Sequence, residues 1–261
     1  MTTTGYRTDA ATLSPELIES YRRDGFVRIP GVITLAEAAE FREAALEVQR
    51  RMQDHNLTAG GRSANTFDQF VNVWQLDEQM RRLTLHPNVG GVAERLAGVP
   101  LRIWHDQTLI KRPQRSTPTE FHQDQPYWPH DNSPHAISAW IALVDVPVEK
   151  GCMTFIPGSY HRDDLRSQDL NDAGSLFALA PDLAWAERVT IPLRAGDCTF
   201  HHARCAHMAN ANVTEEQRVA HTVIFMDATT IFRGTGHVVT DPLELEAGKE
   251  FDHPMFPRVG A

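Results

Sequence analysis

The chain has 261 residues, of which 41% are hydrophobic and 23% are charged, a composition typical of soluble globular proteins. Its formal net charge of −9 disfavours binding to nucleic acid or to anionic membrane surfaces. No apolar run approaches the roughly 20 residues that a membrane-spanning helix needs, and the first residues lack the basic-then-apolar layout of a signal peptide.

Cysteine usage indicates a reducing compartment. The three cysteines, Cys152, Cys198 and Cys205, are an odd number and include no CxxC pair, so we expect free thiols and a cytoplasmic location. Cys205 lies two residues before His207, which leaves a zinc site of cysteine and histidine open. That alternative is disfavoured, because no second cysteine stands at a usual zinc-ligand spacing.

The first third of the chain has mainly helical signals. Ser14-Pro15-Glu16 predicts a helix start and Gly25 its end, and a short strand is predicted over 26–29. A second helix opens at Thr34, where Glu37 completes a capping box. A loop rich in Asn, Gly, Ser and Thr is predicted over 54–66, followed by two short helices at about 76–85 and 87–97.

Strand signals dominate from residue 101 onward. Strands are predicted at 101–111, around His122, and at 136–144, 152–156, 189–193, 197–202 and 218–226. Residues 162–188 interrupt this rhythm, and an insertion of this length is often a lid. The pattern predicts one domain over 1–261, with a helical portion at about 14–97, a core at about 101–226 and a variable tail. The expected fold is mainly β with flanking helices, built on a double-stranded β-helix of jelly-roll (cupin-like) type.

Within the strand at residue 122, a histidine and an aspartate stand two positions apart. Alternate side chains of a strand point the same way, so His122 and Asp124 would reach into the same space. Two facial ligands of a non-haem iron(II) site need this arrangement, with a further imidazole from a distant strand. The pair by itself is weak, because His-x-Asp occurs by chance in many chains.

A second stretch supplies the missing groups. His207 provides a third ligand, and Arg218, eleven residues later, can clamp a carboxylate through its planar guanidinium. His201 and His202 are rival ligands. They would point to opposite faces of a strand, and neither has an arginine at the matching distance. Packing, or support of the ligands, is the favoured reading for both. An open metal face beside such an arginine suits 2-oxoglutarate, which chelates iron at one end and carries a free carboxylate at the other.

These residues resemble a known family. The motifs His122-Gln123-Asp124, Tyr127-Trp128-Pro129, Trp140, Ile156-Pro157-Gly158-Ser159-Tyr160-His161 and His207…Asn212…Thr214…Arg218 are similar to those of the phytanoyl-CoA dioxygenase family of Fe(II)/2-oxoglutarate oxygenases. The resemblance covers roughly residues 15 to 226. One departure is local: Met208-Ala209 stands where relatives often have Gly-Ser, so a serine hydroxyl for the cosubstrate carboxylate is absent.

The resemblance implies a site and a reaction. His122, Asp124 and His207 would hold Fe(II), Arg218 would bind 2-oxoglutarate, and Trp140 would wall the cosubstrate pocket. Gln123 would reach the cosubstrate only if its strand is distorted. Lys111 is either a second positive charge near the site or, more simply, a surface lysine.

With O2, such an enzyme releases succinate and CO2 while it hydroxylates, or otherwise oxidises, a C–H bond. Because Asp124 fills the place that halide takes in related halogenating enzymes, halogenation is disfavoured. The expected substrate is a small metabolite or natural-product intermediate, which Tyr127 and Trp128 could help to line. The expected assembly is a monomer or small homo-oligomer.

Two rival functions stay open. One is a metal-dependent isomerase or hydrolase that does not oxidise its substrate and would have no use for Arg218. The other is a small-molecule-binding barrel without activity, which would normally lack one of the ligands.

Overall fold

The structure is a computed structural model that describes residues 7–58, 67–114 and 116–260. Positions 59–66 of the predicted 54–66 loop lie outside the described residues. The helices are α1 (Pro15–Asp24), α2 (Leu35–Arg51), α3 (Glu78–Thr84), α4 (Pro87–Ala97) and α5 (Ser175–Leu179). The strands are β1 (Phe26–Ile29), β2 (Asp68–Val71), β3 (Leu101–Lys111), β4 (Thr119–His122), β5 (His130–Asp131), β6 (Ile137–Ala142), β7 (Met153–Phe155), β8 (Val189–Ile191), β9 (Cys198–His202), β10 (His207–Ala209), β11 (Arg218–Asp227) and β12 (Ile231–Phe232).

Two antiparallel sheets face each other across the core. The larger sheet has six strands in the order β1-β9-β6-β11-β3-β2, and the smaller has four in the order β4-β10-β7-β8, among the described residues. Side chains from both sheets, such as Trp140 and Ala220 from the larger and Phe155 from the smaller, pack together between them. Hydrogen bonding does not close the two sheets into one barrel in the described part of the chain. The expected fold class, mainly β with a double-stranded β-helix core, is confirmed.

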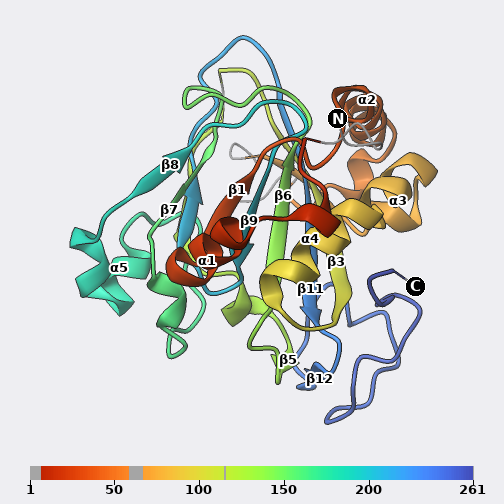
Figure 1. Cartoon of the computed structure of the whole chain (residues 1–261), viewed down its shortest axis with the longest axis vertical. Helices are drawn as coiled ribbons and strands as arrows, with labels where there is room; N and C mark the ends of the chain where they lie inside the picture. Colours follow the sequence, from red (N-terminus) through yellow and green to blue (C-terminus); the bar gives the residue numbers. More distant parts are fainter. Residues whose placement is uncertain (1–6, 59–66, 115, 261) are drawn as a thin grey trace.

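The helices of the first third of the chain cover the outer face of the six-stranded sheet (Figure 1). Phe41 and Val48 of α2 and Leu96 of α4 lie in the same buried cluster as Phe200 of β9 and Val223 of β11. Each of these five side chains is at most 1% exposed, so this layer holds much of the apolar burial that stabilises the fold. The opposite face of the same sheet is thereby left to line the interior.

Local sequence signals set the limits of the helices. Gly25 ends α1 in the left-handed region at φ 81°, where its N–H donates to Tyr21 O. The side chain of Thr34 accepts from Glu37 N, and Glu37 accepts in return from Thr34 N, so the predicted capping box is present at the start of α2. The predicted helix over 87–97 is α4, which begins at Pro87 and is followed by Gly98 at φ 74°.

The strand prediction was wrong at the metal-binding motif. Strand β4 ends at His122, and Asp124 adopts helical angles (φ −75°, ψ −45°) before a short 3₁₀ turn over Gln125–Tyr127. Asp124 N donates to Ala203 O instead of to a neighbouring strand of its sheet. A turn therefore directs the carboxylate of Asp124 toward His122, in place of the strand alternation that we expected.

The C-terminal segment is more closely integrated than its weak periodicity indicated. Phe251 and Phe256 are fully buried against Trp104 of β3, and Arg102 Nη1 donates to Phe256 O at 3.0 Å. These contacts hold residues 227–260 against one end of the six-stranded sheet. Part of the tail therefore packs into the core, while most of its residues remain exposed or half-buried.

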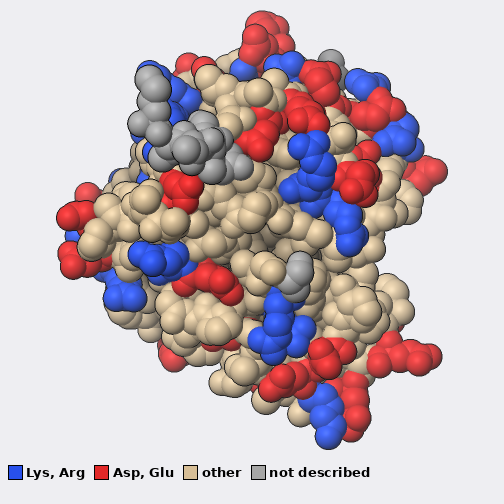
Figure 2. Space-filling view, turned by 45° about the vertical axis from the view of Figure 1, so that its right-hand side comes forward, with Lys and Arg blue, Asp and Glu red and all other residues tan. Residues whose placement is uncertain are grey.

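Among the described residues, no helix is long and apolar enough to cross a membrane. On the face that Figure 2 shows, described Lys and Arg side chains lie among Asp and Glu side chains and are separated by uncharged surface.

Candidate active site

Two histidines far apart in the sequence are direct neighbours in the four-stranded sheet. His122 of β4 pairs with His207 of β10, and their ring centroids lie 4.3 Å apart. His122 Nδ1 lies 2.7 Å from Glu120 O, and His207 Nδ1 lies 2.9 Å from Cys205 O. Because each carbonyl can only accept a hydrogen bond, Nδ1 carries the proton, and the Nε2 lone pair of each ring is free for a metal. Burial lowers the pKa of His207 to about 3, which keeps the imidazole neutral.

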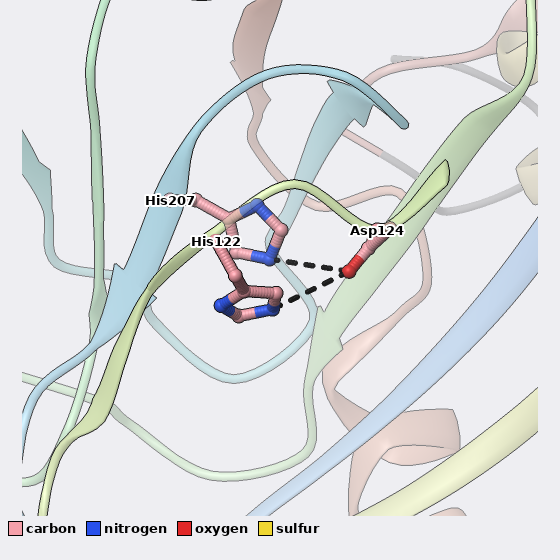
Figure 3. A group of neighbouring side chains, drawn as sticks. All are labelled: His122, Asp124 and His207. Carbon is pink, nitrogen blue, oxygen red and sulfur yellow. Dashed lines mark ion pairs between the residues drawn. The ribbon is translucent and has the colours of Figure 1, made fainter. Parts of the chain in front are cut away.

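Asp124 completes the cluster. Its Oδ1 lies 3.4 Å from His122 Nε2 and 3.7 Å from His207 Nε2, as Figure 3 shows. One ligand atom from each of the three residues lies within 4.8 Å of the others, close enough to contact a single ion. Two imidazole nitrogens and one carboxylate oxygen are the donor set of a non-haem iron(II) site with open positions. The structure therefore brings together the three ligands that the sequence indicated.

Arg218 is buried beside this cluster, at the start of β11. Its side chain is 1% exposed, and its guanidinium carbon lies 5.2 Å from the ring centroid of Trp140. Nε and Nη1 have no hydrogen-bond partner among the described residues. Burial lowers the pKa of Arg218 to about 9, so the group is still charged at neutral pH. An unpaired buried cation is costly, and the arrangement fits an anionic ligand such as the free carboxylate of 2-oxoglutarate.

The turn before β11 positions Arg218 so that its side chain faces the interior. Asn212 Nδ2 donates to Glu216 O at 2.7 Å and to Lys111 O at 3.3 Å, while its Oδ1 accepts from the N–H and the hydroxyl of Thr214. The Asn212 and Thr214 positions of the motif thus shape this turn. Arg218, Thr222 and Ile224 then lie on one face of the strand and line the interior.

One cavity of about 270 Å³ joins all of these groups. Its lining residues include His122, Asp124, His207, Trp140 and Arg218. The remaining lining is mostly apolar or uncharged: Leu57, Phe67, Gln69, Val71, His105, Gln107, Leu109, Thr119, Tyr127, Trp128, Met153, Leu170, His201, Ala209, Thr222, Ile224, His237 and Val238. A mostly apolar cavity with a few convergent polar groups is the usual form of a small-molecule site.

Two of the residues considered for the site do not reach this cavity. Gln123 Nε2 donates to the backbone carbonyls of Arg162 and Arg204, so the side chain is occupied on the far side of its loop. The prediction that Gln123 contacts the cosubstrate is therefore wrong.

Lys111 is fully buried and donates to the carbonyls of Thr117 and Asn210, so the prediction that it is a surface lysine was wrong. Burial lowers the pKa of Lys111 to about 6, which removes most of its charge at neutral pH.

The neighbouring residues of β9 separate as strand geometry requires. His201 lines the cavity near Asp124, whereas His202 faces away and lies 2.9 Å from Pro134 O. Cys205 is buried, and burial raises the pKa of its thiol to about 12. A protonated thiol outside the cavity lining does not support the zinc alternative.

Some lining residues were missed by sequence reasoning. Gln69 belongs to β2, a strand that we did not predict, and His237 and Val238 belong to the tail. Tyr127 and Trp128 do lie at the cavity, as predicted. No periodicity marks residues 237 and 238, so only their place in the folded molecule identifies them.

Comparison with known proteins identifies relatives of this chain. Residues 21–220 match the family model of phytanoyl-CoA dioxygenase (PhyH). A mouse protein named phytanoyl-CoA dioxygenase domain-containing protein 1 is 24% identical over 84% of this chain and 91% of its own length. The L-proline trans-4-hydroxylase of Streptomyces griseoviridis is 28% identical over 54% of this chain and 53% of its own length.

Solved structures give a stronger likeness. The chain is similar to SnoK, a non-haem α-ketoglutarate-dependent carbocyclase from nogalamycin biosynthesis, with a TM-score of 0.87, 38% identity, and coverage of 97% of this chain and 98% of that one. SnoN, an epimerase from the same biosynthesis, gives a TM-score of 0.83 and 39% identity over 94% of this chain and 98% of that one. SnoN has also been solved with Fe³⁺, α-ketoglutarate and a nogalamycin compound. With most of its length matched by the family model, this chain belongs to the phytanoyl-CoA dioxygenase family.

Proposed function

We propose that this chain is an Fe(II)- and 2-oxoglutarate-dependent dioxygenase that oxidises an unactivated C–H bond of a natural-product intermediate, with hydroxylation as its outcome. One observation carries the proposal: the ligand atoms of His122, Asp124 and His207 converge within 4.8 Å in the cavity that also holds the unpaired guanidinium of Arg218. A metal site alone would suit many enzymes. The buried arginine adds a place for the carboxylate that 2-oxoglutarate leaves free.

Each residue then has a definite task. His122, Asp124 and His207 would hold the metal, and Arg218 would bind the far carboxylate of 2-oxoglutarate. Trp140, 3% exposed beside Arg218, walls that end of the cavity and excludes water. The bound iron and 2-oxoglutarate supply the oxidising chemistry, with dioxygen consumed and succinate and CO2 released.

The cavity lining favours an uncharged substrate. Among the described lining residues, Asp124 and Arg218 are the ones with carboxylate or guanidinium groups, and the metal and the cosubstrate engage both. Gln69, Gln107 and His237 offer neutral hydrogen-bonding groups, and Trp128 offers a flat apolar surface. We infer a neutral, ring-bearing compound with hydroxyl or carbonyl groups. SnoK and SnoN are named for nogalamycin biosynthesis, which supports a natural-product intermediate as the first choice of substrate.

Two other reactions, ring closure and inversion of a stereocentre, are also supported by the comparisons. The two structures with 38% and 39% identity are named a carbocyclase and an epimerase, so neither name describes hydroxylation. Ring closure or inversion of a stereocentre therefore competes with hydroxylation as the reaction. Mass spectrometry separates the three outcomes: hydroxylation adds one oxygen atom, ring closure removes two hydrogen atoms, and inversion leaves the mass unchanged.

The first experiment is the anaerobic addition of Fe(II) and 2-oxoglutarate to the purified chain. We expect a weak visible charge-transfer band that requires both additions. A non-oxidative metal enzyme or a simple binding protein would give no such band, and its absence would reject the proposal. Candidate compounds are then screened for O2-dependent succinate formation that is coupled to a new product, beginning with neutral, ring-bearing compounds and including an acyl-CoA thioester and free L-proline for contrast.

A further inference from the structure

His201 lines the cavity beside Asp124 as a third imidazole next to His122 and His207, and the proposed reaction assigns it no task. It lies on β9, is 2% exposed, and places Nε2 3.6 Å from Asp124 Oδ2. Its ring centroid lies 4.5 Å from that of His207. Its other nitrogen, Nδ1, is buried without a hydrogen-bond partner among the described residues. The side chain of Asp124 is therefore the polar group that His201 faces.

The two oxygens of the Asp124 carboxylate have different surroundings. Oδ1 faces His122 and His207, the two imidazole ligands. Oδ2 faces the larger sheet, where Ser138 Oγ donates to it at 3.2 Å and His201 Nε2 lies 3.6 Å away. Ser138 of β6 and His201 of β9 are direct cross-strand partners, so one register position of the sheet supplies both contacts.

Asp124 needs such support more than the other ligands do. His122 and His207 are held by a strand ladder and by carbonyl contacts to Nδ1. Asp124 lies in a turn outside the strand, and its backbone N–H contacts Ala203. Its side chain would otherwise rotate about two bonds, and a carboxylate with both oxygens free can bind a metal through one oxygen or through both.

We propose that His201, together with Ser138, is a positioning residue that holds Asp124 Oδ2 and so presents Oδ1 as a single-oxygen ligand. This inference rests on the proposed function, because a one-oxygen carboxylate keeps three metal positions open for 2-oxoglutarate and dioxygen. The group that supports a metal ligand commonly changes metal affinity by about 10- to 100-fold when it is removed. His201 supports the ligand from the opposite sheet, which also links the two sheets at the site.

The strand supplies a matched control. His202 is the next residue, is also buried, and contacts Pro134 O and Arg204 N on the opposite face of β9. Loss of either imidazole disturbs the packing of the same strand, but only His201 faces Asp124. His201→Gln serves as the conservative variant, because a glutamine amide can donate from nearly the position of the histidine Nε2–H.

The experiment is an anaerobic Co(II) titration of the full chain followed by its visible absorption, with and without 2-oxoglutarate. We compare wild type with His201→Leu, His201→Gln, Ser138→Ala and His202→Leu. We expect about 10- to 100-fold weaker Co(II) binding and an altered spectrum for His201→Leu. A smaller loss is expected for Ser138→Ala, recovery of most of the affinity for His201→Gln, and wild-type binding for His202→Leu.

Three results would overturn the inference. The first is Co(II) binding by His201→Leu with wild-type affinity and an unchanged spectrum, and the second is a loss of affinity in His202→Leu as large as in His201→Leu. In these two cases wild type still binds Co(II), so the proposed function stands. The third is complete loss of binding in both His201 variants, which would make His201 a metal ligand and leave fewer open positions than the proposed function needs. A wild-type chain that binds no metal rejects both the inference and the proposed function.

Discussion

In the described part of the chain, two buried clusters that combine histidine with aspartate differ in that one opens on a cavity and the other does not. In the active site, His122, Asp124 and His207 direct their ligand atoms into shared space. In the second cluster, Asp106 accepts from Val73 N at 2.8 Å, from Trp74 N at 2.9 Å and from Thr84 Oγ1 at 2.7 Å. His221 contacts the hydroxyls of Thr84 and Thr108 at 2.9 Å and 3.1 Å, so both of its nitrogens are also engaged.

The comparison shows that residue type alone does not make a metal site. Asp106 stands between His105 and Gln107, two residues that line the cavity, and strand alternation sends Asp106 to the opposite face of β3. Backbone N–H groups and hydroxyls there leave no room for an ion. At Asp124 and Arg218, by contrast, polar atoms still face open space. The second cluster is structural, and the first is available for ligands.

The largest effect should follow from loss of a ligand. Asp124→Ala removes one of the three donor atoms, so we expect Fe(II) or Co(II) binding to weaken by more than the roughly 100-fold upper range of supporting groups. Succinate formation should stop with it. Metal titration and a turnover assay measure the two effects, and wild-type turnover in this variant would show that Asp124 is not a ligand.

A substitution in the cluster of Asp106 and His221 should change the stability of the protein and not its metal binding. Asp106→Asn replaces an acceptor by an amide that cannot accept from all the donors around it, and each buried unsatisfied group costs about 1–3 kcal/mol. We expect the free energy of unfolding to fall by about 2 kcal/mol, while Co(II) affinity stays at the wild-type level. Urea denaturation measures the stability, and a parallel titration measures the Co(II) affinity. Weaker metal binding in the folded variant would show that Asp106 affects the metal site after all.

Arg218→Gln should separate 2-oxoglutarate binding from metal binding within the candidate active site. Hydrogen bonds to charged groups contribute about 1.5–3 kcal/mol, so we expect 2-oxoglutarate to bind about 10- to 100-fold more weakly. Co(II) binding without 2-oxoglutarate should change little, because Arg218 holds no metal. Titration of the anaerobic Fe(II) complex with 2-oxoglutarate provides the measurement. Full activity in this variant would favour a metal enzyme that uses no such cosubstrate.

A dependence of stability on pH should accompany these effects. Burial, partly offset by the hydrogen bonds that it accepts, raises the pKa of Asp106 from 3.8 to about 7. Its protonated form is therefore favoured by folding. The resulting contribution to stability is complete below the unfolded pKa and is lost as pH rises to about 7. The stability difference between wild type and Asp106→Asn should accordingly shrink between about pH 4 and pH 7 and then level off. A constant difference across that range would show that Asp106 is ionised throughout.

Several parts of the fold and site followed from local sequence. Gly25 and the Thr34–Glu37 capping box marked helix limits correctly, because these signals act within a few residues. The spacing of His207 and Arg218 was informative because a short strand, a turn shaped by Asn212 and a second strand separate them. Lys111 was misread, since nothing near it in sequence indicates that the carbonyls of Asn210 and Thr117 surround its amine.

The candidate ligand types, the position of Arg218 and the class of the fold could be predicted from the sequence, because side-chain chemistry and strand patterns are local properties. The folded molecule was needed to show that a turn orients Asp124, that His201 and not His202 faces its carboxylate, and that the tail reaches the cavity. These features depend on which distant strands pair and in what register. A shift of one residue would turn His201 out of the site and His202 into it.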